Sequence, residues 1–158
     1  MTVKRRVSTC LWFNDEGEEA ANFYVSLFPN SRVVSVTRYG EGAPMPKDLA
    51  MLTRFELDGV QFAALNGGPH FKLTEAASLV ALCDTQQEID RLWTALTAKG
   101  GAESRCGWLK DRFGLSWQII PSFLDEVMAD PARAGRVMAA VMPMKKIDIA
   151  TLKAADKA

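Results

Sequence analysis

The chain has 158 residues, a length that suits one domain. Hydrophobic residues make up 48% of it and charged residues 24%, which is enough apolar material for a core and excludes a disordered chain. Nineteen basic and nineteen acidic residues give a formal net charge of zero, so no net field attracts nucleic acid or an anionic membrane.

Apolar runs and cysteines narrow the class further. No apolar run reaches the ~20 residues that a membrane-spanning helix needs, and the first segment lacks the apolar core of a signal peptide. Cys10, Cys83 and Cys106 are widely spaced and match no CxxC or Cys/His zinc spacing. We therefore expect reduced thiols in a cytoplasmic protein.

The first half of the chain predicts a strand, a helix and three further strands. Acidic residues at the start of residues 15–28 suit the positive end of a helix dipole, and Pro29 ends this pattern. Asp58-Gly59 lies between two apolar runs, which is the strongest short-range signal for a hairpin. The expected elements are a strand over 8–13, the helix over 15–28, a strand over 32–39, a loop over 40–50 and the hairpin over 52–68.

The same order of elements then begins again. A strand over 77–84 precedes a helix whose start carries a capping box made by Thr85 and Glu88. The expected buried stripe of this helix consists of Ile89, Leu92, Trp93 and Leu96. A second hairpin follows over 111–120. The shared order, and the constant offset that pairs Gly59 with Gly114, indicate an internal repeat.

Residues 122–158 differ in character, because they are rich in Ala and Met and predict helices. Asp130 can cap a helix that has Pro131 at its first position. An apolar stripe of Val137, Met138, Val141 and Met142 is expected to pack on the same domain or on a second subunit. The predicted organisation is a single domain over 1–158, with module one over 5–68, module two over 77–121 and a helical C-terminal tail over 122–158.

Five segments resemble one known family. They are LWFNDEGEEAANFYVSLFPNS, LNGGPHFKLTEAASLVALC, QQEIDRLWTAL, CGWLKDRFGLSWQIIP and DPARAGRVMAAVMPMKKIDIATL. The chain is identified as a member of the PhnB-like group, often labelled 3-demethylubiquinone-9 3-methyltransferase, in the vicinal-oxygen-chelate superfamily of glyoxalase I, extradiol dioxygenases and bleomycin-resistance proteins. The resemblance implies an α+β fold of two βαβββ modules that form a curved, cup-shaped mixed sheet, here with C-terminal helices, and it implies a homodimer.

Metal-dependent members of that superfamily resemble one another in four ligand positions, which supply His and Glu to a divalent ion. Carried over, these positions fall at Ser8 or Thr9, at Ala63, at Ser78 and at Gln118. None is His, Asp, Glu or Cys, so we expect no metal and no other cofactor. The Gly-rich segments GEGAP and LNGGP also do not open a helix after a strand, as a methyl-donor site would require.

The remaining candidate site implied by the resemblance is the inside of the cup-shaped sheet. We expect it to hold a small molecule between aromatic walls. The candidate ligand-binding residues are Cys10, Trp12, Phe55, Phe62, His70, Ser78, Trp108, Trp117 and Gln118. Gln118 is informative because a buried amide needs hydrogen-bond partners, which a ligand can supply. Each aromatic residue taken alone is better explained as core, and His70, the only histidine, as a loop residue.

Three functional interpretations stay open. The first is a metal-free, bleomycin-resistance-like protein, a cytoplasmic homodimer that holds an apolar or aromatic small molecule. The second is an enzyme of the 3-demethylubiquinone-9 3-methyltransferase-labelled group that acts on a small aromatic or oxygenated substrate, with His70 or Cys10 in proton transfer. The third is a regulatory protein whose Met-rich C-terminal helix docks another protein. None of them involves nucleic acid or a membrane.

Overall fold

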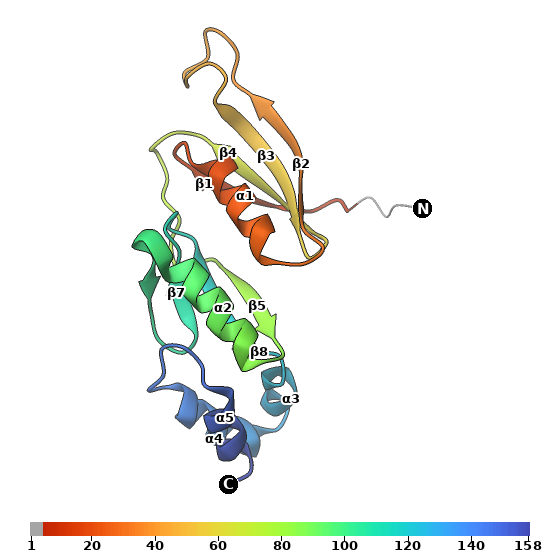
Figure 1. Ribbon diagram of the computed structural model, residues 1–158, viewed down its shortest axis with the longest axis vertical. Coiled ribbons are helices and arrows are strands. Elements are labelled where there is room, and N and C mark those ends of the chain that lie inside the picture. The colour runs from red at the N-terminus through yellow and green to blue at the C-terminus, as the bar shows by residue number, and fades with distance from the viewer. Residues whose placement is uncertain (1–4) are drawn as a thin grey trace. The chain divides into compact units, whose positions relative to one another are not determined.

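The computed structural model describes residues 5–158, so the first four residues of the predicted domain over 1–158 lie outside it (Figure 1). The chain divides into two compact units, Met1–Leu73 and Thr74–Ala158. Predicted module one falls in the first unit, and predicted module two and the tail fall in the second. Each unit has its own four-stranded mixed sheet with helices, as expected for an α+β fold.

The first unit is a sheet with one helix packed on it. Its elements are β1 (Thr9–Phe13), α1 (Gly17–Leu27), β2 (Arg32–Arg38), β3 (Ala50–Leu57) and β4 (Val60–Asn66). The strand order is β1-β4-β3-β2, in which β1 runs parallel to β4 and the other pairs are antiparallel. Asp58 and Gly59 have φ of 46° and 75°, the positive values that a two-residue hairpin turn requires, so the predicted hairpin is confirmed.

The core of the first unit lies between α1 and the sheet. Tyr24 of α1 is fully buried, and its ring centroid lies 6.3 Å from that of Phe55 on β3. Phe55 in turn stacks on Phe62 of β4 at 5.4 Å. Because side chains alternate along a strand, the face opposite α1 carries the other set. We call this face the first open face; it contains Cys10, Trp12, Leu52, Arg54, Ala63 and Leu65.

The second unit repeats the strand order of the first. Its repeat elements are β5 (Ser78–Cys83), α2 (Gln86–Thr97), the 3-10 turn η1 (Ala98–Gly100), β6 (Ala102–Glu103), β7 (Trp108–Lys110) and β8 (Ser116–Pro121), with sheet order β5-β8-β7-β6. Thr85 and Glu88 form the predicted capping box, and all four residues of the predicted stripe of α2 are buried. The internal repeat predicted from the sequence is therefore confirmed.

The face of the second sheet opposite α2 is partly apolar and exposed. Val80 and Leu82 of β5 are each 54% exposed, whereas Ala81 and Cys83, on the α2 side of the same strand, are buried. We call this face the second open face; it contains Ser78, Val80, Leu82, Trp108, Lys110, Ser116, Gln118 and Ile120. Trp108 pairs directly with Gln118, and Val80 lies on the other side of Gln118.

The tail is three helices that belong to the second unit. They are α3 (Leu124–Met128), α4 (Pro131–Val141) and α5 (Ile149–Asp156), and Asp130 caps α4 as predicted. The predicted apolar stripe is only half buried within the unit: Val137 and Val141 are buried, but Met138 and Met142 are exposed. No helix of residues 5–158 has the length and apolar character that crossing a bilayer requires.

The loop between α4 and α5 ties the tail to the repeat elements. The backbone amides of Cys106 and Gly107 donate to the carbonyls of Met144 and Lys145, each at 2.8 Å. The Gln86 side chain, in the first turn of α2, donates to the Ile147 carbonyl and accepts from the Ile149 amide at 3.0 and 2.9 Å. The tail therefore completes the second unit instead of trailing from it.

Candidate functional site

Two of the four inherited ligand positions meet on the second open face. Gln118 Nε2 donates a hydrogen bond to Ser78 Oγ at 3.0 Å, across the parallel pair β5–β8. Both side chains are half-buried. Gln118 Oε1 accepts no hydrogen bond from residues 5–158 and stays available to a donor. The half-buried ring of Trp108 lies on the neighbouring strand of the same face.

The other two positions lie in the first unit and offer fewer polar side-chain atoms. Ala63 pairs with Cys10 as Gln118 pairs with Val80, which makes Ser8, two residues before Cys10, the structural counterpart of Ser78. Of the two alternatives Ser8 and Thr9, the strand register favours Ser8. Ala63 has no polar side-chain atom, so Ser8 has no partner at that position to match the amide of Gln118.

These residues do not fit the divalent ion of the metal-dependent superfamily members. The four positions offer two hydroxyls and one amide, with no carboxylate, imidazole or thiolate to neutralise and hold a transition metal. The amide of Gln118 is already bonded through its nitrogen to Ser78. Across residues 5–158, no group of three or more His, Cys, Asp or Glu side chains is arranged to hold a metal ion.

Three of the predicted aromatic residues lie in the cores and not on the open faces. Phe55 and Phe62 lie on the α1 side of the first sheet, and Trp117 lies on the α2 side of the second. Strand alternation places them there, because they are one residue out of phase with Arg54, Ala63 and Gln118. Phe55 and Phe62 line a small pocket of about 80 Å³ at one end of their strands.

The segment Asn66-Gly67-Gly68, part of the family-like motif, has a structural role that the sequence did not reveal. Asn66 is 1% exposed, and its side chain accepts from the Gly17 amide at 2.7 Å and donates to the Asp15 and Ala50 carbonyls at 3.1 and 2.9 Å. It thus joins β4 to the start of α1 and to β3. An amide at the last position of the predicted strand, directly before two glycines, was the available signal.

Trp12 packs on the glycines of the same segment. Its Nε1 donates to the Gly68 carbonyl at 2.9 Å, and its ring meets that of Phe71 edge-on at 4.9 Å. A Cβ on Gly67 would lie 2.3 Å from two ring carbons of Trp12, so only glycine fits there. Trp12 is therefore held in place within the first unit, with one edge on the first open face.

The second family-like motif, which contains Asp111 and Trp117, also stabilises the fold. The buried Asp111 carboxylate accepts from the backbone amides of Phe113 and Leu115 and from Trp117 Nε1, at 2.9, 3.1 and 2.9 Å. Cys106, at φ 58°, and Gly107, at φ 82°, form the turn that binds the tail. The structure thus places Asp111 in the turn between β7 and β8 and accounts for the motif by hydrogen bonds that stabilise this turn.

His70 and Cys10 are both exposed, His70 in the loop that follows β4 and Cys10 on the first open face. Among the described residues His70 forms no hydrogen bond or ion pair, so no acid or nucleophile orients it for proton transfer. Cys10 likewise lacks a base partner. The structure does not bring either residue together with Ser78, Trp108 or Gln118 within one unit.

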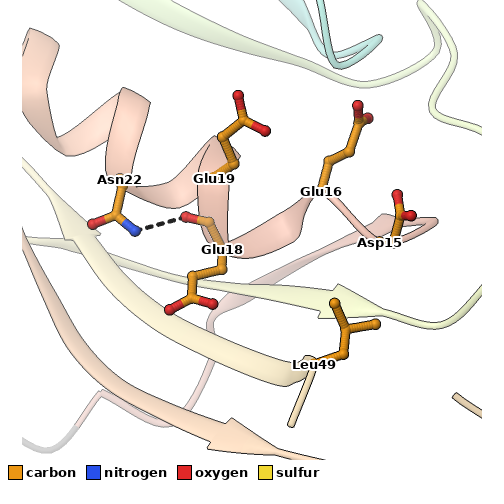
Figure 2. A pocket seen from close by; sticks show the side chains of 6 residues that line it. All are labelled: Asp15, Glu16, Glu18, Glu19, Asn22 and Leu49. Atoms are coloured by element: carbon orange, nitrogen blue, oxygen red, sulfur yellow. Dashed lines mark hydrogen bonds between the residues drawn. The ribbon is translucent and has the colours of Figure 1, made fainter. Parts of the chain in front are cut away.

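An acidic pocket of about 540 Å³ lies at the start of α1, lined by Asp15, Glu16, Glu18, Glu19, Asn22 and Leu49 (Figure 2). Figure 2 shows the Glu18 carboxylate turned away from the other three, and Glu18 pairs with Arg38 at 2.8 Å. The carboxylates therefore do not converge on a cation. Their position at the positive end of a helix dipole explains the cluster.

Sequence comparison identifies the family. The sequence model described as 3-demethylubiquinone-9 3-methyltransferase matches residues 5–120, which end just before the tail. A search of curated proteins gave no significant match.

Comparison with solved structures supports both family and fold. The PhnB protein from Bacillus cereus is 34% identical, with a TM-score of 0.70 over 75% of this chain and 100% of that one. Protein PA1353 from Pseudomonas aeruginosa is 22% identical, with a TM-score of 0.61 over 75% and 98%. The fosfomycin resistance protein FosX from Listeria monocytogenes is 13% identical, with a TM-score of 0.56 over 79% and 97%, and shares the fold alone. The chain therefore belongs to the PhnB-like family described as 3-demethylubiquinone-9 3-methyltransferase, with the two-module fold of the glyoxalase and bleomycin-resistance proteins.

Proposed function

We propose that this protein binds a small, partly aromatic molecule without a metal ion, and that the second open face is its binding surface. The observation that carries the proposal is the Ser78–Gln118 hydrogen bond set among exposed apolar side chains. Ligand sites combine apolar walls with a few fixed polar groups, and this face has both. Trp108 supplies an aromatic wall beside the amide.

The polar pair leaves one acceptor and one donor for a ligand. Gln118 Oε1 can accept a hydrogen bond, and the Ser78 hydroxyl, which already accepts from Gln118 Nε2, can donate one. A ligand hydroxyl can donate to Gln118 Oε1 and accept from the Ser78 hydroxyl, whereas a ligand carbonyl can accept from Ser78 alone; in both cases Val80 and Leu82 cover the apolar part. Burial of these two exposed side chains adds a hydrophobic contribution.

The activities in the names of similar proteins do not by themselves apply to this chain. FosX is named for fosfomycin resistance, but its likeness to this chain is one of fold. For a methyl-donor cofactor, Gly40 and Gly42 lie in the loop between β2 and β3, and Gly67 and Gly68 lie in the loop between β4 and β5. Neither loop leads into a helix, so the residues present do not fit a nucleotide-type methyl donor.

Thermal melting with added ligands tests the proposal. A ligand that binds only the folded state raises the melting temperature by mass action. We expect no shift with zinc, nickel, manganese or iron, and a shift with members of a library of small aromatic alcohols, phenols and ketones. Gln118→Leu should remove that shift, whereas Gln61→Leu, an exposed change on β4, should retain it. A stoichiometric metal ion that raises the melting temperature would refute the metal-free proposal.

Turnover distinguishes a binding protein from an enzyme of the same family. Each compound that raises the melting temperature is incubated with the protein, and its mass is followed over time. An unchanged mass supports binding alone, and a product that Gln118→Leu fails to form supports the enzyme interpretation.

A homodimer in the cytoplasm is part of the same proposal. The family resemblance supports the dimer, and three cysteines without disulfide partners, Cys10, Cys83 and Cys106, suit a reducing compartment. Sedimentation velocity should give about twice the mass of 17.4 kDa for the chain. A monomer at micromolar concentration would remove the dimer from the proposal.

A further inference from the structure

Beside the second open face, the Thr74–Ala158 unit has a pocket that contains a buried hydroxyl. A pocket of about 220 Å³ is lined by Glu75, Ala102, Glu103, Ser104, Trp108, Leu109, Lys110 and Ser116. Trp108, Lys110 and Ser116 belong to the second open face, so the pocket continues that face toward β6. Its volume lies below the ~300 Å³ at which pockets for drug-sized ligands begin, so its ligand is small.

Ser116 is the reason to expect a ligand there. Ser116 is 1% exposed, and its hydroxyl has no hydrogen-bond partner among residues 5–158. Buried polar groups in folded proteins are almost always bonded, and one that is not is destabilising unless something else satisfies it. A molecule in the pocket that presents a hydroxyl or carbonyl oxygen to Ser116 supplies the missing bond.

The charged groups around the pocket are already paired. Lys110 Nζ forms an ion pair with Glu75, and the hydrogen bond from Lys110 lowers the pKa of Glu75, which keeps this pair ionised at neutral pH. Glu103 accepts from Trp93 Nε1 at 2.8 Å and lies 3.8 Å from Lys145. Two acids matched by two bases leave no net charge to attract an ion, so a neutral ligand is favoured.

The Lys110–Glu75 pair lines the same pocket as Ser116. Lys110 is directly opposite Ser116 in the β7–β8 pair. Its side chain is 40% exposed, and that of Glu75 is 66% exposed, so solvent screens their attraction. This screened pair is weak, so it would let Lys110 change rotamer when a ligand enters beside Ser116 and the ring of Trp108.

We propose that this pocket binds a small neutral aromatic molecule that carries a hydroxyl or carbonyl group, with Ser116 as its hydrogen-bond partner and Trp108 as its stacking surface. The inference rests on the proposed function, because it names the ligand class of the same face. It assigns to Ser116 a recognition role that is distinct from that of the Ser78–Gln118 pair, and it places Trp108 at the border of both.

Phenol and toluene are a suitable probe pair, because they share a ring and a similar size and differ in the hydroxyl. Both are titrated into the full-length protein labelled with ¹⁵N, and the indole Nε1–H signals are followed by nuclear magnetic resonance. Trp108 Nε1 has no hydrogen-bond partner among the described residues, whereas Trp12, Trp93 and Trp117 each donate to one. A Trp108→Phe variant assigns the signal.

We expect phenol to shift the Trp108 signal saturably and toluene to bind about fivefold more weakly, the loss that one hydrogen bond of average strength produces. Ser116→Ala should reduce the affinity for phenol to that for toluene. The same variant should melt at the wild-type temperature or above, because it removes a hydroxyl without a partner. Thr53→Val is the matched control: Thr53 Oγ1 is also buried without a partner, but it lines none of the pockets described above.

Other outcomes separate this inference from the proposed function. Equal phenol affinity in wild type and Ser116→Ala overturns the inference. Phenol shifts confined to the Gln118 side-chain amide also overturn it, while they support ligand binding on the second open face. If phenol causes no saturable shift at all, this ligand class is wrong, and the melting screen still tests the proposed function independently.

Discussion

At the scale of single residues, the family-like motifs stabilise the fold before they do anything else. Asn66 joins three segments through its side chain, and its own carbonyl accepts from the Tyr39 hydroxyl at 2.6 Å. Asp111 does the same for the turn between β7 and β8. Residues in these motifs are therefore poor evidence for catalysis, and the proposed ligand recognition rests instead on Ser78, Gln118 and Ser116.

Asn66→Ala should destabilise the first unit strongly. The change leaves the Gly17 amide and the Asp15 and Ala50 carbonyls without their partner, and we expect a loss of about 2–4 kcal/mol in the free energy of unfolding. Urea denaturation measures this as a lower midpoint at constant m-value. The control is Asn22→Ala, because Asn22 is exposed and bonds only within α1. Equal midpoints for the two variants would contradict the role of Asn66.

Cys83 should resist alkylation that Cys10 accepts. Burial raises the pKa of the Cys83 thiol to about 11, and Cys10 is exposed. At pH 8 a thiol with that pKa is ionised in about one molecule in a thousand, and only the thiolate reacts. Mass spectrometry after iodoacetamide treatment should find Cys10 modified and Cys83 intact, with both modified in urea. Equal rates in the folded protein would show that Cys83 is accessible.

At the scale of elements, the helices of the repeat were predictable and the burial of the strands was less so. The capping box of α2 is a local signal, so Thr85 and Glu88 mark the helix start without tertiary information. Strand alternation predicts that a strand has two faces but not which one a helix covers. The sequence therefore did not show which of Phe62 and Ala63 faces α1, and the structure did.

Helices α4 and α5 are joined by an ion pair between residues that are far apart in the sequence. Arg133 donates twice to Asp156, each bond 2.8 Å long, and also to Glu126 at 3.1 Å. The sequence separates Arg133 and Asp156 by 23 residues, so helical spacing gave no hint of it. This bidentate geometry is the favourable form of an arginine–carboxylate pair.

Acid should weaken this helix pair. The hydrogen bonds from Arg133 lower the pKa of Asp156 below its ordinary value of 3.8. A carboxyl group with a lowered folded pKa stabilises the protein above its unfolded pKa, and that stabilisation is lost as the pH falls through the folded value. Urea midpoints of wild type should therefore exceed those of Asp156→Asn at pH 7 and converge with them as the pH falls below the folded pKa of Asp156. The exposed Asp125→Asn is the control, and a difference independent of pH would contradict the assignment.

At the scale of the whole molecule, the repeat explains why the fold was predictable and the site was only partly so. Two sheets with orders β1-β4-β3-β2 and β5-β8-β7-β6 follow from one pattern written twice, which the sequence displays. The four inherited positions then follow by register, and their chemistry is visible in the sequence. The partnerless hydroxyl of Ser116 is not, because burial and the absence of a partner are both tertiary properties.

Removing residues 122–158 should unfold the second unit. The tail supplies carbonyl partners to Cys106 and Gly107, and it contributes the fully buried Ile147 and Leu152. We expect the truncated protein to lose its near-ultraviolet circular dichroism from Trp93 and Trp117. A control that ends at Asp156 keeps α5 complete and should fold. A native spectrum for the long truncation would instead favour the interpretation of the tail as a docking element.

The contact between Trp12 and Gly67 restricts the order in which substitutions at these two positions can be accepted during evolution. A side chain at position 67 collides with the indole, so almost any substitution there is deleterious while tryptophan occupies position 12. A smaller residue at position 12 must come first, and only then does position 67 become free to vary. Homologues should therefore include some with Gly67 and a small residue at position 12, and few with tryptophan beside a larger residue at position 67.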